Sequence, residues 1–180
     1  SYMYIGPQGI VHGTTITVLN AFRKINKEPK GGLFVTSGLG GMSGAQARAM
    51  LITGATGIIA EVDGDAIRQR LADQYIRQED LFDDVYALLH QFNQSKASGE
   101  ARCFVYHGNI VDLWEAIVEK FIHIELGSDQ TSCHNIDQMG YCPAGYTFEE
   151  AKKLLQDDKS AFEEAIKTSL HRHIHAINIL

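Results

Sequence analysis

A glycine-rich segment between a short apolar run and a helix-forming stretch holds the residue types best suited to chemistry. The segment 37–46 contains four glycines, three of which stand close together at Gly38, Gly40 and Gly41. A dinucleotide diphosphate needs a turn of this kind, because amides at the start of the next helix must approach its oxygens without side-chain bulk. The G-x-G-x-x-G spacing ends on Ser43 rather than on a glycine. The segment therefore favours a dinucleotide site, although an ordinary tight turn would use the same glycines.

An acidic residue, Glu61, stands at the end of the next apolar run, 23 residues after Gly38. In dinucleotide-binding folds an acid near this position binds the ribose 2′-hydroxyl, a position that NADP blocks with a phosphate. The spacing therefore predicts NAD rather than NADP as the ligand. Asp63 and Asp65 lie close by in the sequence, so the pattern alone does not decide which acid takes this role.

Two more polar segments follow later apolar runs, and loops beyond the carboxyl ends of parallel strands are where ligands bind. In the first, 107–109, Asn109 either caps the next helix or contacts the cofactor. The second, 129–135, is dense in hydrogen-bonding side chains and is either part of the site or a polar surface loop. Both segments are therefore candidate site loops.

Two patterns containing histidine suggest chemistry that the wider sequence does not support. Cys133 stands next to His134, but a general base must face the thiol in space, which sequence neighbours seldom achieve. His171 and His175 share one helical face, as in a metal site, but no carboxylate or cysteine partner is evident. We therefore expect no catalytic residue and no metal site here, and a solvated basic helix end at 171–175.

The elements that must position these residues alternate between strands and helices. Apolar runs typical of strands buried on both faces of a parallel sheet occur at 33–36, 57–62, 103–106 and 121–126. Helices are expected at 14–24, 44–53, 65–76, 79–93 and 110–120, with two closing helices at about 147–156 and 158–177. Thr147 and Glu150 predict a capping box. The order predicts an α/β fold with a doubly wound, mainly parallel sheet of about four or more strands, helices on both faces and helical ends.

Length and composition indicate one globular domain, 1–180. The chain has 180 residues, 44% apolar and 21% charged, enough to bury a core. Its net charge of -6 opposes nucleic-acid binding, which depends on clustered Lys and Arg. No apolar run reaches the roughly 18 to 20 residues that cross a bilayer, and 1–4 lack the features of a signal peptide, so no membrane partner is expected. Three cysteines without a CxxC pair argue against a disulfide framework and favour a cytoplasmic setting.

Four segments resemble signatures of the urocanase family and stand in the family's order. They are YIGPQGIVHGTT (4–15), TSGLGGMSGAQ (36–46), DQTSCHN (129–135) and GYCPAGYTFEE (140–150), so the resemblance spans nearly the whole chain. It implies the Rossmann-like domain of an enzyme that hydrates urocanate to 4-imidazolone-5-propanoate in histidine degradation. It also implies a homodimeric parent enzyme in which tightly held NAD⁺ acts as an electrophile rather than a redox carrier. An oxidised nicotinamide can accept electron density from the substrate's imidazole system, which opens that ring to water.

By motif, the resemblance assigns cofactor contacts to the glycine turn, the strand ends and the loops beyond them: Gly41, Met42, Ser43, Glu61, Asn109, Ile110, Gln130, Thr131, Ser132, Cys133, His134, Tyr141 and Cys142. One position departs from the family pattern, because many members carry an arginine where Ala66 stands. That charge contact is lost here unless Arg68 or Arg70 supplies it.

The resemblance also bears on how much of the enzyme this sequence contains. Chains of the family are several times longer, and the motifs holding their catalytic tyrosine, arginine, aspartate and reactive cysteine are not in this sequence. We therefore expect an excised domain that binds NAD weakly or incompletely and has no hydratase activity alone, with urocanate bound through the missing part. The residues leave two alternatives open: a free-standing nucleotide-binding module without chemistry, and half of an NAD-dependent dehydrogenase.

Overall fold

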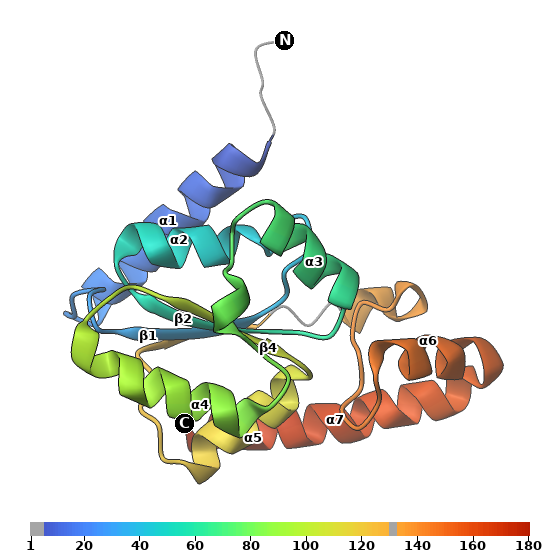
Figure 1. Ribbon diagram of the computed structural model, residues 1–180. Helices are drawn as coiled ribbons and strands as arrows, with labels where there is room; N and C mark the ends of the chain where they lie inside the picture. The colour runs from blue at the N-terminus through green and yellow to red at the C-terminus, as the bar shows by residue number, and fades with distance from the viewer. Residues whose placement is uncertain (1–5, 130–132) are drawn as a thin grey trace.

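The computed structural model describes residues 6–129 and 133–180, and within them five strands form one sheet (Figure 1). The strands are β1 (Leu33–Ser37), β2 (Thr56–Glu61), β3 (Leu81–Phe82), β4 (Cys103–His107) and β5 (Leu126–Gly127). The helices are α1 (Pro7–Lys24), α2 (Ala45–Thr53), α3 (Gly64–Ala72), α4 (Val85–Ser95), α5 (Ile110–Glu119), α6 (Phe148–Asp157) and α7 (Lys159–Ile179). Short 3-10 helices lie at Gln78–Asp80, Lys96–Ser98 and Cys133–Gln138.

The chain adds strands first on one side of β1 and then on the other. The order is β3-β4-β2-β1-β5, and each described pairing is parallel. From β1 the chain moves outward through β2 to β3 at the far edge and comes back one place to β4, and it then crosses to the other side of β1 with β5. Open α/β sheets bind ligands at such a reversal, beyond the carboxyl ends of the strands. The loops that follow β1, β2, β4 and β5 all lie at that edge of the sheet.

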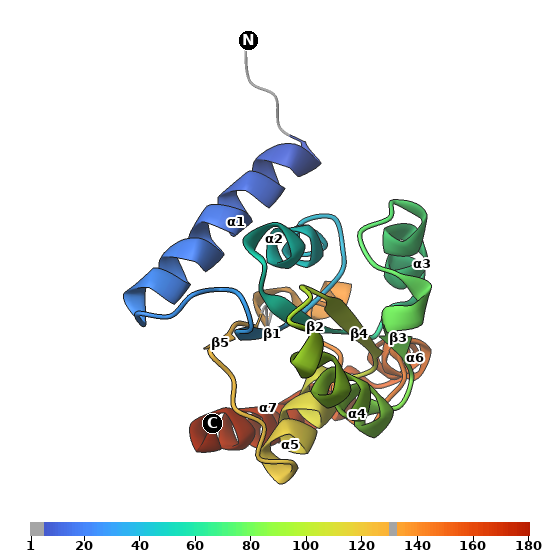
Figure 2. The same cartoon turned by 60° about the vertical axis from the view of Figure 1, so that its left-hand side comes forward.

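Each face of the sheet is covered by its own helices (Figure 2). Successive strand residues point to opposite faces, so Phe34 and Val105 pack with α1, α2 and α3, whereas Val35 and Phe104 pack with α4 and α5. Helix α7 lies against α5 on the second face. The predicted α/β fold with helices on both faces of a parallel sheet is therefore confirmed.

The expected fourth strand at 121–126 is wrong in extent. Phe121 turns the chain after α5 with a φ of 50°, and only the two residues of β5 pair with β1. Upstream of β5, the Glu125 side chain accepts the Leu33 amide at 2.7 Å, where a longer strand would offer a backbone carbonyl. Ile122 is buried, but in a loop. The apolar residues of 121–126 therefore do not form a strand along the whole segment, and only its last residue belongs to β5.

Other helix boundaries differ from the expected ones where a proline or a capping side chain, rather than the spacing of apolar residues, sets the start of the helix. Helix α1 begins at Pro7, ahead of the expected start at 14, because proline suits the first helical position. The stretch expected as a helix at 79–93 contains the short strand β3, and α4 begins only after Asp84, whose side chain accepts two amides of the first turn. The expected helix at 65–76 ends at Ala72.

The C-terminal helices hold a loop over the carboxyl edge of the sheet. The capping box is confirmed: the Thr147 hydroxyl accepts the Glu150 amide at 3.3 Å and the Glu150 carboxylate accepts the Thr147 amide at 2.8 Å. Arg172 of α7 pairs with Glu115 of α5 at 2.7 Å. The Ala144 amide donates to the Ser169 hydroxyl of α7 at 2.7 Å, which ties the loop before α6 to α7. Within the described residues, no helix combines the length and apolar character that crossing a membrane requires.

Gly57 provides a test of the packing between β2 and α2. A Cβ added there would lie 1.7 Å from the Met50 sulfur, and Met50 is fully buried. We expect Gly57→Ala to lower the free energy of unfolding by about 1–3 kcal/mol through overpacking, measured by urea denaturation. Shortening Met50 to Val should reduce that loss.

Gly13→Ala is the matched control, because Gly13 lies on the exposed side of helix α1 and an added Cβ there meets nothing within 4 Å. It should be neutral or stabilise by roughly 0.5–1 kcal/mol. Equal losses in the two variants would contradict this account of β2 packing.

Candidate functional site

A cleft of about 260 Å³ opens where the carboxyl ends of β1, β2 and β4 meet the loop that follows β5. The three strands end level with one another, since Ser37 pairs with Ala60 and Ala60 with Tyr106. Residues from separate parts of the sequence therefore share its wall, among them Gly38, Gly40, Glu61, Asn109, Asp129 and Tyr141. The three segments selected from the sequence, 37–46, 107–109 and 129–135, thus contribute to one cavity.

The glycine turn after β1 requires glycine at its first position. Gly38 has a φ of 92°, and a Cβ there would lie 2.8 Å from the Ser43 hydroxyl oxygen. Gly40 also lines the cleft, whereas Gly41 is exposed. Among the described residues, the amides at 40–43 have no hydrogen-bond acceptor, while those of Gly44, Ala45 and Gln46 bond within the turn. The turn therefore offers free backbone donors next to the start of α2, as an anion site requires.

Glu61 is the acid that faces this turn. One carboxylate oxygen accepts the Leu39 amide at 2.6 Å, and the other accepts the Asp63 amide at 2.9 Å. Asp63 caps α3 through the Asp65 amide, and Asp65 forms an exposed ion pair with Arg68. The geometry thus favours Glu61 over the other two acids as a ligand for a group bound at the turn.

Asn109 caps the next helix and also ties together two walls of the cleft. Its side-chain oxygen accepts the Val111 amide at 2.9 Å, so the capping interpretation is confirmed. Its amide nitrogen donates to the Cys142 carbonyl at 2.9 Å. Asn109 is 6% exposed and, with Ile110, it lines the cleft.

Tyr141 and Cys142 form the wall opposite the strand ends. Burial, followed by the charge of Asp129, raises the pKa of Tyr141, and its hydroxyl has no hydrogen-bond partner among the described residues. Burial, followed by the charge of Glu61, raises the pKa of the Cys142 thiol to about 11. Both groups are therefore protonated at neutral pH, and the Tyr141 hydroxyl is a buried group without a partner among the described residues.

Asp129 links the end of β1 to α7. Its Oδ1 accepts a hydrogen bond from the Ser37 hydroxyl. Its Oδ2 lies 2.7 Å from Nε2 of His173, although no hydrogen is aligned between these two atoms. The His173 ring stacks on Tyr141 with 6.5 Å between centroids. A largely buried polar cluster of Ser37, Asp129, Tyr141 and His173 therefore backs this side of the cleft.

His173 was missed by the sequence interpretation, which considered His171 and His175. His173 is buried, whereas the other two are exposed. The signal was the helical spacing from Phe162 and Ile166, which places position 173 on the inward face of α7. The described residues contain no group of three His, Cys, Asp or Glu side chains arranged to hold a metal.

The remaining candidates either lie away from the described lining of the cleft or are not described by the structure. Met42 is exposed and lines a different groove, beside α1. Cys133 is half-buried at the start of a 3-10 helix. Gln130, Thr131 and Ser132 lie outside the described residues, and the His134 side chain is likewise not described.

Neither arginine supplies a charge to the cleft at Ala66. Ala66 lines the cleft, as its place in the family pattern implies. Arg68 pairs with Asp65 at the surface, and Arg70 pairs with Asp73 at 3.1 Å while lying over the Tyr75 ring. Among the described residues, the wall of this cleft therefore contains no arginine in place of the one that the family pattern implied at Ala66.

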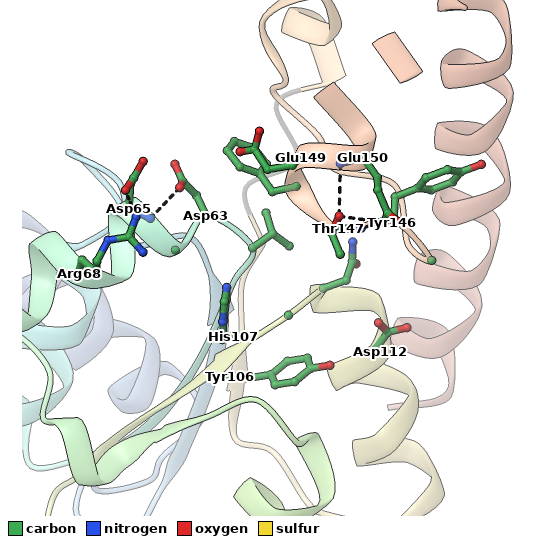
Figure 3. Close-up of a pocket in the computed structure, with 16 residues that line it drawn as sticks. Asp63, Asp65, Arg68, Tyr106, His107, Asp112, Tyr146, Thr147, Glu149 and Glu150 are labelled. Carbon is green, nitrogen blue, oxygen red and sulfur yellow. Dashed lines mark hydrogen bonds and ion pairs between the residues drawn. The ribbon is translucent and has the colours of Figure 1, made fainter. Parts of the chain in front are cut away.

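A larger cavity of about 560 Å³ adjoins the cleft and shares Asp63 and Asn109 with it. Figure 3 shows it between the start of α3, the end of β4 and the capping box at Thr147 and Glu150. Arg68 lines its edge. The two spaces together extend the cleft along the carboxyl edge of the sheet, away from β5.

Comparisons with known proteins agree with this arrangement. The family model described as the Urocanase Rossmann-like domain matches residues 6–180. Urocanate hydratase of Mus musculus is 47% identical over 187 residues, and that of Homo sapiens is 43% identical over 187 residues. Probable urocanate hydratase of Dictyostelium discoideum is 47% identical over 186 residues. Each alignment covers 100% of this chain and 27% of the relative, so the chain spans about a quarter of their length.

The raised pKa of Cys142 leads to a test of the cleft's environment. Because burial keeps this thiol protonated to about pH 11, we expect its alkylation at pH 8.5 to be roughly 100-fold slower than that of a free cysteine. Iodoacetamide labelling at several pH values, read by peptide mass spectrometry, measures Cys142 separately from the other cysteines.

Glu61→Gln should lower the apparent pKa of Cys142, because it removes a negative charge that disfavours the thiolate. Glu164→Gln, which changes an exposed residue of α7, should leave the profile unchanged. A Cys142 that titrates near pH 8.5 would show that this wall of the cleft is open to water.

Proposed function

This chain belongs to the urocanase Rossmann-like domain family, and we propose that it is the NAD-binding domain of a urocanate hydratase. The parent enzyme would add water to urocanate to give 4-imidazolone-5-propanoate in histidine degradation. Relatives named urocanate hydratase match the whole of this chain with 27% of their own length. Most of the catalytic apparatus would therefore lie in the other part of such an enzyme.

The observation that carries the NAD proposal is the contact between Glu61 and the glycine turn. A carboxylate at the tip of β2 lies against the Leu39 amide, next to the free amides at 40–43. This pairing of backbone donors with a carboxylate suits a diphosphate joined to a ribose, because the donors favour the anion and the acid accepts a sugar hydroxyl. An acid in this place also disfavours the 2′-phosphate of NADP.

The residues of this chain would have separate tasks in holding NAD. The turn amides, including those of Gly41, Met42 and Ser43, would donate to the diphosphate, and Glu61 would accept from the ribose. Asn109 and Ile110 would form the floor of the cleft, and the Tyr141 hydroxyl and Cys142 would close it. We extend the site to Gln130, Thr131, Ser132, Cys133 and His134 on the family pattern alone. When bound, NAD⁺ would supply an electrophilic nicotinamide ring to the substrate's imidazole system.

The proposal assigns no catalytic residue to this chain. Residues 1–180 would act as one cofactor-binding domain, with urocanate held largely by the rest of the enzyme, and the chain alone would have no hydratase activity. The charge of -6 and the three cysteines support a cytoplasmic protein that does not bind nucleic acid. The homodimeric state of the parent enzyme is proposed from the family alone.

NAD⁺ titration tests the proposal directly. We expect the chain to bind NAD⁺ in a calorimetric titration and to bind NADP⁺ more weakly, because Glu61 repels a 2′-phosphate. Glu61→Gln should weaken NAD⁺ binding about tenfold and narrow the difference between the two nucleotides, through loss of a charged acceptor.

Glu164→Gln, an exposed change on α7, controls for the change in net charge and should bind NAD⁺ like the original chain. Circular dichroism would verify that both variants are folded. Unchanged NAD⁺ affinity in folded Glu61→Gln would refute the assigned role of this carboxylate.

A further inference from the structure

The wall of the cleft carries an unusual charge for a site proposed to bind a diphosphate. Its described lining includes three carboxylates, Glu61, Asp63 and Asp129, and no lysine or arginine. The free amides of the glycine turn can offset the negative charge of a diphosphate, but they do not neutralise the three carboxylates. The cleft therefore disfavours additional negative charge on a ligand and favours a ligand with a cationic part.

The carboxylates lie on both sides of the glycine turn. Glu61 ends β2 on one side of β1, and Asp129 follows β5 on the other side. A dinucleotide bound at a strand-order reversal extends across both sides, so its two nucleoside halves meet different acids. If Glu61 binds the adenosine ribose, as the proposed site has it, the half on the Asp129 side would be the nicotinamide half.

Asp129 is also the carboxylate with the fewest amide donors. Both oxygens of Glu61 accept backbone amides, and Asp63 accepts the Asp65 amide. Asp129 has the Ser37 hydroxyl at one oxygen and the unaligned His173 contact at the other. Its charge is therefore less dispersed by fixed dipoles than that of Glu61.

We propose that Asp129 makes this cleft selective for the oxidised, cationic form of NAD over the reduced form, by placing a carboxylate on the nicotinamide side of the glycine turn. This inference rests on the proposed NAD site. The nicotinamide ring is cationic in NAD⁺ and neutral in NADH, so the two forms differ by one charge at the end of the cleft that Asp129 lines. One charge in a half-buried site with an effective dielectric constant of about 20 is sufficient for about tenfold selectivity.

The state of His173 does not change the direction of the effect. Its ring faces Asp129 and Tyr141, while the neighbouring Arg172 is engaged by Asp112 and Glu115 of α5. With the imidazole in the same protonation state before and after the change, replacing Asp129 with asparagine makes the local field more positive by one charge. Asparagine also keeps an acceptor for the Ser37 hydroxyl, so the wall retains its shape.

The test compares NAD⁺ and NADH binding to the whole chain, by calorimetry for NAD⁺ and by nicotinamide fluorescence for NADH. We expect the original chain to bind NAD⁺ about tenfold more tightly, and Asp129→Asn to abolish most of this preference. Asp137→Asn is the matched control, because it removes the same charge from an exposed side chain. It should retain the preference.

The outcomes separate this inference from the proposed function. If the original chain binds neither nucleotide, the NAD site itself is wrong. If it binds both equally, or if folded Asp129→Asn keeps the full preference, the role of Asp129 is wrong while the NAD site stands. Should circular dichroism show that Asp129→Asn is not folded, Asp129→Ser removes the same charge with a smaller hydroxyl group and is read in the same way.

Discussion

The hydrogen bond from the Leu39 amide to the Glu61 carboxylate is the contact on which the site depends. It joins the turn after β1 to the tip of β2, and the second oxygen of the same carboxylate holds the Asp63 amide. Leu39 is fully buried, so its amide would otherwise lack a partner, at a cost of about 1–3 kcal/mol. The carboxylate therefore shapes the glycine turn before any ligand binds, and the amides at 40–43 have no acceptor among the described residues.

The C-terminal part of the chain completes the cleft from the other side. Asn109 holds the Cys142 carbonyl, and Ser169 of α7 holds the Ala144 amide, so the loop before α6 has fixed points on both α5 and α7. Asp129 connects the same region to Ser37. A ligand at the strand ends would thus contact a wall set by three elements that are distant in sequence. This arrangement pre-organises the site, which lowers the entropic cost of binding.

The sequence predicted the parts of this structure that depend on local patterns. The strands β1, β2 and β4 are continuous buried apolar runs, and the spacing from Gly38 selected Glu61 as a candidate for the acid that faces the turn, which the Leu39 contact then distinguished from Asp63 and Asp65. It did not predict that β5 would be short, because that depends on Glu125 taking the Leu33 amide from a distance in sequence. Nor did it identify His173, whose contact with Asp129 exists only once α7 packs against α5. Side-chain partners supplied by tertiary packing are not encoded in any single segment.

The central claim is that NAD lies across the carboxyl ends of β1, β2 and β4, with its diphosphate on the glycine turn. The most direct measurement is the change in backbone amide chemical shifts of the ¹⁵N-labelled chain as NAD⁺ is added. The account predicts saturable shifts at 40–43, at Asp63 and around Asn109, with little change in α4 or the first half of α1. Shifts absent from the glycine turn, or gathered instead on the helical faces of the sheet, would contradict it.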